Sequence, residues 1–257
     1  MTSMDYYHLV LYITFGVLPS LIWLFYYLAK DMHPEPKKAI LKVFLLGALS
    51  TVPVIFFQLW LSESLIQGQY LVALYLPEIS GYLVFLLPVI KWFFIIAFTE
   101  EFFKYLVVRL SIFNNGVLDE LLELMLYMVV SALGFAALEN MLYLFTPLYG
   151  ASLSTVFSVT VTISFIRFVG ATFLHTLCSA LIGYFLIKSS FDHTKRLRFT
   201  FIGITLAVLL HGLYDFSIMT LSRPFNLLVP VLIIGVLALF MLYDFDEVRK
   251  MKGICKL

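Results

Sequence analysis

The stretch Ile95-Ile96-Ala97-Phe98-Thr99-Glu100-Glu101-Phe102-Phe103-Lys104-Tyr105-Leu106-Val107-Val108 combines a long apolar run with two adjacent carboxylates and a lysine. Its apolar residues predict a helix that lies in or near a lipid bilayer, where charged side chains are costly to hold. Ionisable residues in such segments are candidates for a functional site. The stretch therefore predicts both a helical membrane protein and the place of its site.

The composition of the whole chain agrees with this prediction. Of its 257 residues, 62% are hydrophobic and only 13% are charged, and the mean hydropathy is +0.99. Soluble domains are nearer half apolar and about a quarter charged. We expect one integral-membrane domain over residues 1–257, with no large soluble part. The net charge of +1 and the lack of a basic domain face argue against a nucleic-acid partner.

Seven apolar segments predict the helices of an all-α polytopic transmembrane bundle, with six to eight spans as the range. They cover residues 8–29, 42–61, 82–110, 121–145, 158–187, 199–220 and 227–243. A spanning helix needs about 20 apolar residues, which most of these segments supply. The stretch 69–90 is an eighth span or a re-entrant piece in the alternative interpretation, because Pro77 and Pro88 interrupt it.

The basic residues predict the orientation of the chain in the membrane. If the loop 30–42 is cytoplasmic, fourteen of the 17 Lys and Arg residues lie on or near the cytoplasmic side. The exceptions are Arg223 in an outside loop, and Lys91 and Arg167 within spans. Because cytoplasmic loops carry an excess of Lys and Arg, the N-terminus is expected outside and the C-terminus in the cytoplasm.

The charged residues of the opening stretch share one face of their helix. Lys104 follows Glu100 by four residues and Glu101 by three, the offsets at which helical side chains are neighbours. Lys104 can therefore neutralise one carboxylate and leave the other free to act. Polar side chains interrupt other spans at Glu139 and Asn140, at Arg167, at His175, and at His211 with Asp215. At its four-residue offset, Asp215 can fix the imidazole tautomer of His211.

Counting along the helices puts these groups at a similar depth. His175, His211 and Glu101 each lie 13 residues from the expected cytoplasmic end of their span, and Glu139 lies 16. At 1.5 Å per residue these separations are about 20–24 Å. We expect four helices to bring the groups into one site, beyond the bilayer midpoint towards the outside.

Carboxylates and imidazoles in an apolar pocket suit hydrolysis. A glutamate can take a proton from water while a histidine steadies the oxyanion or protonates the leaving amine. In a second interpretation, Glu101, Glu139, His175 and His211 bind zinc, whose bound water becomes the nucleophile. The His-Glu-x-x-His signature of many zinc proteases is absent from the sequence.

Two other classes of function also use such residues. Ionisable side chains within spans form the proton relays of transporters, so a proton-coupled transporter is an alternative of a different class. The sequence shows no repeated halves of the kind common in secondary transporters. Polar side chains can also simply connect helices by hydrogen bonds, as His175, the Glu139–Asn140 pair or the His211–Asp215 pair could do.

At these residues the sequence resembles the PrsW family of intramembrane proteases, which belongs with the CAAX-protease-like membrane peptidases. The family's Glu-Glu-x-x-Lys motif corresponds to Glu100, Glu101 and Lys104, its Phe-x-x-x-Glu motif to Phe135 and Glu139, its intramembrane histidine to His175, and its His-x-x-x-Asp motif to His211 and Asp215. The early Glu35-Pro36 is also similar. Four motifs in the right order on separate spans make a specific match.

The resemblance implies an endopeptidase of the bacterial cytoplasmic membrane that cuts membrane-anchored proteins. The best-known family role is the first, outer-side (site-1) cut of a membrane-bound anti-sigma factor in envelope-stress signalling. The related enzymes look like glutamic proteases, so we expect no cofactor, with zinc as the alternative.

The expected roles of the site residues follow from this resemblance and from the chemistry above. Glu100 and Glu101 activate water, while His175 and His211 bind the oxyanion or the water. Glu139 and Asp215 orient the histidines, and Lys104 balances the charge. Asn140 and Phe135 support the site.

Overall fold

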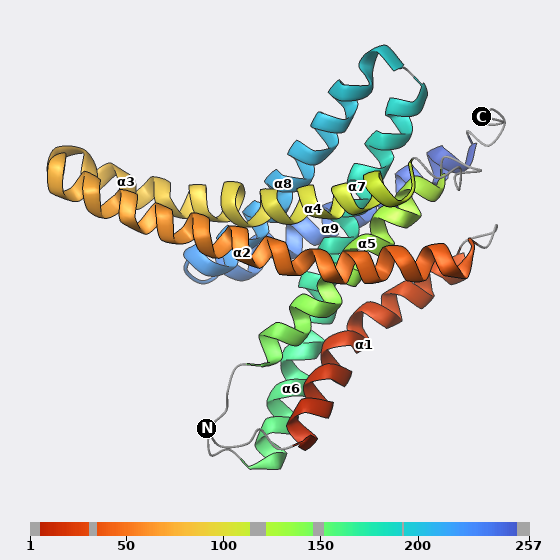
Figure 1. Ribbon diagram of the computed structural model, residues 1–257, viewed down its shortest axis with the longest axis horizontal. Coiled ribbons are helices and arrows are strands. Elements are labelled where there is room, and N and C mark those ends of the chain that lie inside the picture. The colour runs from red at the N-terminus through yellow and green to blue at the C-terminus, as the bar shows by residue number, and fades with distance from the viewer. Residues whose placement is uncertain (1–5, 31–34, 114–121, 146–151, 192, 251–257) are drawn as a thin grey trace.

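The computed structural model describes residues 6–30, 35–113, 122–145, 152–191 and 193–250 (Figure 1). Within these ranges the chain forms helices joined by short turns and contains no strand, so the all-α prediction is confirmed. The basic C-terminal residues 251–257, which contribute to the predicted orientation, lie outside the described residues.

The helices follow one another along the chain with few residues between them. They are α1 (Tyr6–Lys30), α2 (Lys37–Tyr75), α3 (Pro77–Val89), the π-helix η1 (Ile90–Ala97), α4 (Phe98–Ser111), α5 (Leu122–Leu144), α6 (Leu153–Val169), α7 (Ala171–Phe191), the 3₁₀ turn η2 (His193–Lys195), α8 (Arg196–Thr220) and α9 (Phe225–Lys250).

The seven predicted apolar segments all fall in helices, but the helices do not map onto seven simple spans. Among the described residues, five helical stretches are long and apolar enough to cross a membrane by length and composition: 6–29, 37–75, 123–144, 153–190 and 196–220. The predicted span 82–110 is divided among α3, η1 and α4, and the apolar part of α9 is shorter. Seven spans and the orientation therefore remain predictions.

Helix α2 and the unit α3–η1–α4 form one long hairpin (Figure 1). The chain turns back at Leu76, and Pro77 occupies the first position of α3, where a missing backbone N–H costs nothing. The stretch 69–90 is thus not one continuous helix, because it contains the end of α2, the turn and α3. The π-helix η1 then leads directly into α4, and π-helical turns are frequent next to functional sites.

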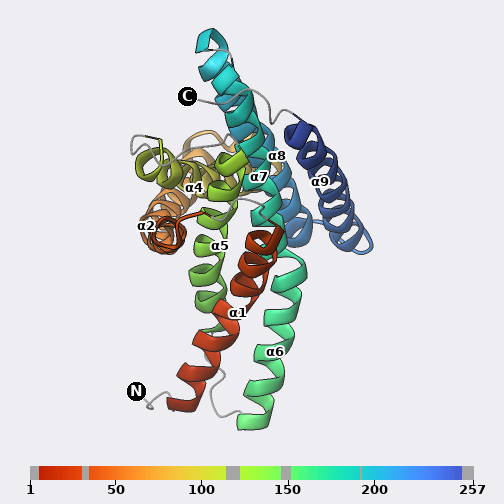
Figure 2. The same cartoon turned by 90° about the vertical axis from the view of Figure 1, so that its right-hand side faces the viewer.

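The predicted single span 158–187 is two helices that meet at Gly170. A side chain at Gly170 would place its Cβ 2.6 Å from the hydroxyl of Tyr214, so glycine allows this close contact with α8 without a shift of the tyrosine. The break allows α6 to contact α1 while α7 continues along α5 and α8 (Figure 2). It also separates Arg167 on α6 from His175 on α7 by a change of helix.

Helix α5 lies at the centre of the bundle, with α1, α2 and α7 packed around it (Figure 2). In that view α2 is seen nearly end-on while α5 and α6 run lengthwise, so the hairpin crosses the other helices. Gly47 of α2 lies against the backbone of Ser131, and Gly134 of α5 lies against the backbone of Phe44. Small residues allow such close approach of helices in membranes, and this approach brings the hairpin onto the face of α5 that carries the site.

Candidate active site

The charged residues of α4 are buried together in the bundle. Glu100 is 5% exposed, and both Glu101 and Lys104 are fully buried. The Lys104 ammonium lies 2.8 Å from Glu101 Oε1 and 3.7 Å from Glu100 Oε2. As the spacing predicted, Lys104 pairs closely with one carboxylate and leaves the other less restrained.

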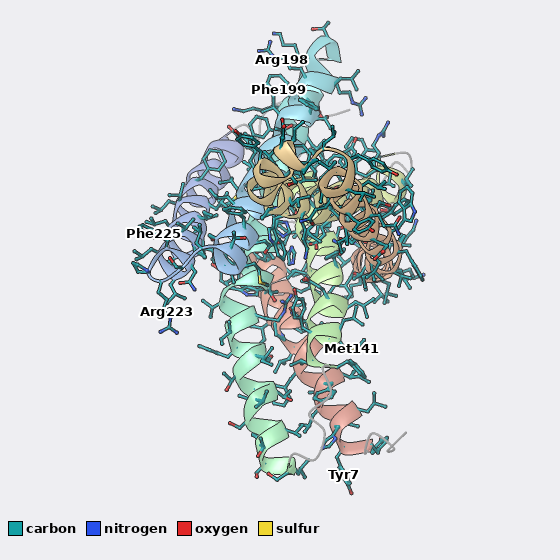
Figure 3. All side chains as sticks on the ribbon, turned by 90° about the vertical axis from the view of Figure 1, so that its left-hand side faces the viewer. Tyr7, Met141, Arg198, Phe199, Arg223 and Phe225 are labelled. Atoms are coloured by element: carbon teal, nitrogen blue, oxygen red, sulfur yellow. The ribbon has the colours of Figure 1, made fainter. Side chains whose placement is uncertain are left out.

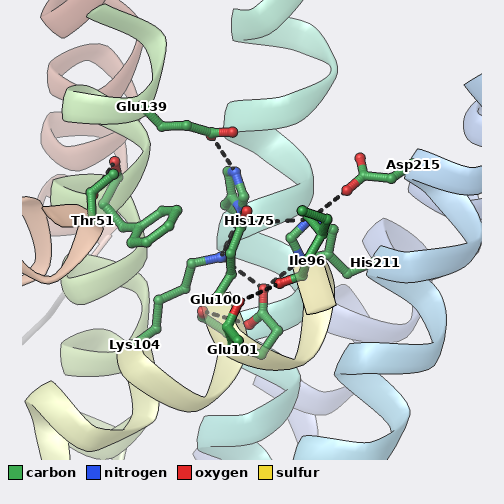
Figure 4. A network of polar contacts seen from close by, with 12 residues as sticks. Thr51, Ile96, Glu100, Glu101, Lys104, Glu139, His175, His211 and Asp215 are labelled. Carbon is green, nitrogen blue, oxygen red and sulfur yellow. Dashed lines mark hydrogen bonds and ion pairs between the residues drawn. The ribbon is translucent and has the colours of Figure 1, made fainter. Parts of the chain in front are cut away.

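His175 on α7 lies between α4 and α5. Its Nδ1 is 2.7 Å from the Lys104 ammonium, and its Nε2 is 2.9 Å from Glu139 Oε2 (Figure 4). The ring also makes an edge contact with Phe135, whose own ring lies 4.6 Å from the Lys104 Nζ. Both nitrogens of this imidazole are therefore held by side chains from two other helices.

His211 on α8 is also held at both ring nitrogens, in its case by two carboxylates. Its Nδ1 lies 2.8 Å from Glu101 Oε1, and its Nε2 lies 3.3 Å from Asp215 Oδ2 (Figure 4). The rings of His175 and His211 are 5.0 Å apart and nearly perpendicular. The predicted pairing of His211 with Asp215 is present, and Glu101 adds a partner that the sequence spacing could not indicate.

Glu100 differs from the other carboxylates in its hydrogen bonding. Its Oε1 accepts a hydrogen bond of 3.1 Å from Gln58 Nε2 on α2, whereas its buried Oε2 accepts none. This Oε2 lies 3.8 Å from His211 Nε2 and 4.0 Å from His175 Nδ1. Buried polar atoms are nearly always hydrogen-bonded, so an unpartnered carboxylate oxygen between two imidazoles marks a reactive position.

A cavity of about 460 Å³ has Glu100 in its wall. Residues from α2, η1, α4, α5, α6, α7 and α8 line it, among them Gln58, Glu100, Glu139, His175, His211 and Asp215. Apolar residues such as Val54, Ile96 and Leu174 form much of the remaining wall. A few convergent polar groups in a mainly apolar cavity are the usual composition of a substrate site.

The structure brings all the predicted site residues together, and it adds several that the sequence reading missed. Glu139 and Asn140 contact Arg167, whose partner could not be identified from the sequence. The residues missed are Gln58, Ser179, which donates to Glu101 Oε2 at 3.4 Å, and Thr172, which accepts from Asn140 at 2.9 Å. In the sequence, each of these three residues is simply a polar side chain within an apolar segment. Many residues with a purely structural role share that feature.

Glu35 is placed away from the site. Its carboxylate accepts a hydrogen bond of 2.6 Å from the Tyr127 hydroxyl. Tyr127 precedes Glu139 by 12 residues on α5, which corresponds to about 18 Å along the helix. Glu35 therefore anchors the start of α2 to α5 and contributes nothing to the chemistry.

The residues also provide a donor set for a divalent cation. Ligand atoms of Glu100, His175 and His211 lie within 4.8 Å of one another. Two imidazoles and a carboxylate are the ligands of many catalytic zinc sites, so the set fits a metal in type and spacing. It contains Glu100 in place of the two predicted glutamates. Glu101 is instead held by Lys104 and His211, and Glu139 is held by Arg167 and His175.

Comparison with known proteins agrees with this geometry. Residues 35–243 match a family described as "PrsW family intramembrane metalloprotease". The Protease PrsW of Oceanobacillus iheyensis is 29% identical over 233 residues, which cover 90% of this chain and 94% of that protein. The Protease PrsW of Bacillus subtilis is 27% identical over 223 residues, covering 86% and 88%.

A third relative, the Protease PrsW of Geobacillus kaustophilus, is 28% identical over 212 residues. No solved structure matches the chain. The family match covers most of the chain and includes the four helices that carry the polar cluster. With its apolar helices, the chain is a multi-pass peptidase of a bacterial membrane, and it belongs to the PrsW family of intramembrane proteases.

Proposed function

We propose that this peptidase cuts membrane-anchored proteins with a water molecule that Glu100 activates as a general base. The observation that carries the proposal is the buried Oε2 of Glu100, which accepts no hydrogen bond and belongs to a residue that lines the cavity. A general base must be able to reach the proton that it removes. Of the two glutamates on α4, Glu100 alone has a carboxylate oxygen available for this step.

The remaining residues have roles that follow from their contacts. Glu101 is fixed by Lys104, His211 and Ser179, so it orients His211 and does not take part in proton transfer. As water adds to the scissile carbonyl carbon, its proton passes to Glu100 and the oxyanion develops beside the two imidazoles. Glu100 then returns the proton to the leaving amine when the C–N bond breaks.

Metal-dependent hydrolysis is the second mechanism to consider, because the family description names a metalloprotease. Glu100, His175 and His211 would hold the ion, and a bound zinc would supply a Lewis acid and an activated water. The Lys104 ammonium argues against this mechanism, since it lies 2.7 Å from His175 Nδ1 and 3.7 Å from Glu100 Oε2. A buried cation beside two of the three ligands opposes a second one, so we favour the glutamic mechanism without a cofactor.

The proposed substrate is a membrane-bound anti-sigma factor, which the enzyme cuts first on the outer side. The resemblance to the PrsW family supports this substrate class, and the predicted depth of the site towards the outside agrees with it. The site lies among helices rather than in a soluble domain, so the cleaved bond should lie in or next to the transmembrane segment of the substrate.

The test is cleavage of a co-expressed anti-sigma factor that carries a different epitope tag at each end. We expect the wild-type enzyme to release the outer fragment and the double variant Glu100→Gln/Glu101→Gln to leave the substrate intact. Full cleavage by the double variant would overturn the proposed function. Purified enzyme should also keep its activity after treatment with a chelator. Loss of activity that zinc restores would instead support the metal-dependent mechanism.

A further inference from the structure

Arg167 is a partly buried cation that no motif of the sequence explains. It lies in the last turn of α6, three residues before the break at Gly170, and its side chain is only 12% exposed. The guanidinium stacks on the ring of Tyr143, with 3.9 Å between the guanidinium carbon and the ring centroid. A charged side chain at such a place is costly unless its partners repay the loss of hydration.

The guanidinium is fixed by side chains of α5. Its Nη2 lies 2.7 Å from Glu139 Oε2, and its Nε donates to Asn140 Oδ1. Asn140 is itself held, because its Nδ2 donates to Thr172 Oγ1 at 2.9 Å. The planar fork of arginine suits two acceptors at a fixed separation, which a lysine cannot reproduce. Arg167 therefore holds the Glu139 carboxylate in one orientation.

Glu139 Oε2 is shared between Arg167 and the histidine of the site. The same oxygen that accepts from the guanidinium lies 2.9 Å from His175 Nε2. At the other side of the ring, His175 Nδ1 lies 2.7 Å from the Lys104 ammonium, which can only donate. Nδ1 must therefore accept, and Nε2 must carry the proton that it donates to Glu139. The contacts select one tautomer of a neutral His175.

We infer that Arg167 is a positioning residue, which sets the orientation of His175 through Glu139. The inference rests on the proposed function, because it concerns the histidine that faces Glu100. Without the guanidinium, the Glu139 carboxylate loses the partner that directs its Oε2. The Nε2–H of His175 then loses an acceptor at a fixed position. The ring can then rotate, and Nδ1 no longer stays beside Lys104 and Glu100.

The experiment compares kcat and KM of purified variants in lipid nanodiscs, with the doubly tagged anti-sigma factor as the probe. We expect Arg167→Ala to lower kcat roughly 10- to 100-fold, the usual effect of removing a residue that orients a functional histidine. KM should stay near the wild-type value, because Arg167 acts through Glu139 and not on the substrate. Arg198→Ala, at the far start of α8, is the control and should keep the wild-type kcat (Figure 3).

Chemical rescue separates this role from a contribution to folding. Guanidinium chloride at low millimolar concentration should restore part of the kcat of Arg167→Ala, since Arg167 lines the cavity and leaves a matching space. Methylammonium, which lacks the planar fork, should not. If Arg167→Ala does not fold, Arg167→Lys carries the test, with a reduced kcat at the wild-type Tm as the supporting result.

The contradicting outcomes are also distinct from failure of the proposed function. Wild-type kcat in Arg167→Ala, or in Arg167→Lys where that variant carries the test, would overturn the inference and leave the protease proposal intact. A raised KM with unchanged kcat would also overturn it, because it would place Arg167 on the substrate. Absence of cleavage by the wild-type enzyme would overturn both.

Discussion

Two regions of the long hairpin carry a carboxylate among apolar residues, and their surroundings differ. On the distal part of α2, Glu63 is exposed and accepts a hydrogen bond of 3.2 Å from Gln67 of the same helix. On α4, Glu100 is buried, and Gln58 of α2, His175 of α7 and His211 of α8 all lie within 4.0 Å of its carboxylate. The Glu63 carboxylate has a neighbour in its own helix, whereas the Glu100 carboxylate has neighbours from three other helices.

This difference shows what marks the site. A carboxylate in an apolar helix is only an indication of function, because it can face away from the bundle as Glu63 does. The convergence of ionisable groups from several helices is the stronger sign, since each must lose water to reach its place. A substitution at the buried site and its match at an exposed position of the hairpin should therefore have different effects on activity or stability.

The largest effect is expected from removal of the base. Glu100→Gln keeps the size and the bond to Gln58 but cannot accept a proton, so cleavage should fall by about 10²- to 10⁴-fold, the usual contribution of general-base catalysis. Glu63→Gln is the same chemical change in the exposed region and should leave the rate unaltered. Equal cleavage rates for the two variants, measured on the tagged substrate, would contradict the proposed difference between the buried and the exposed carboxylate.

The second effect is on stability. Lys104→Met leaves Glu101 buried without its ammonium, and breaking one partner of a buried ion pair costs about 3–5 kcal/mol. The Tm should fall clearly in a thermal unfolding assay in detergent. The double variant Lys104→Met/Glu101→Gln removes both charges and should recover most of the loss. Lys91→Met, at an exposed position of the hairpin, serves as the control and should change the Tm little.

A smaller effect on catalysis is expected from Gln58. Its amide holds Glu100 Oε1, so Gln58→Ala should free the carboxylate to rotate and lower kcat by about tenfold, the loss that corresponds to about 1.4 kcal/mol of transition-state stabilisation. Gln67→Ala removes the equivalent hydrogen bond to Glu63 on the same helix. If both variants had the wild-type kcat, Gln58 would have no part in orienting the base.

The smallest effects should have opposite signs. A Cβ at Gly134 would meet the backbone of Phe44, so Gly134→Ala should push α2 from α5 and cost about 1–3 kcal/mol. A Cβ at Gly68, in the distal part of α2, would meet nothing within 4 Å. Gly68→Ala should therefore stabilise the helix by about 0.5–1 kcal/mol. Measured Tm values that shift in the same direction would contradict the packing described for the two regions.

The sequence predicted much of this molecule for identifiable physical reasons. Hydropathy predicted the helical class, because each apolar segment had to be helical in a bilayer. Helical spacing predicted the Lys104–Glu101 and His211–Asp215 neighbours, because such contacts lie within one helix. Motif order then placed His175 and Glu139 in the same site.

The rest depended on contacts between helices that spacing does not encode. Gln58, Arg167 and Ser179 reach the site only because α2, α6 and α7 pack at particular angles. The break between α6 and α7 at Gly170 was also missed, because a helix can contain an isolated glycine without ending there. The turn at Leu76, by contrast, falls in the stretch 69–90 that Pro77 and Pro88 were predicted to interrupt.

The two glutamates of α4 should differ in how easily they are replaced during evolution, because their hydrogen bonds and ion pairs differ. Glu100 Oε2 accepts no hydrogen bond and lies farther from the Lys104 ammonium than Glu101 Oε1 does, so it contributes less to the fold. A relative that no longer needs catalysis could therefore replace Glu100 in one step at a smaller cost than Glu101. Glu101 and Lys104 neutralise one another, so such a relative should keep both or lose both. Inactive members of the family should therefore show independent change at Glu100 and paired change at Glu101 and Lys104.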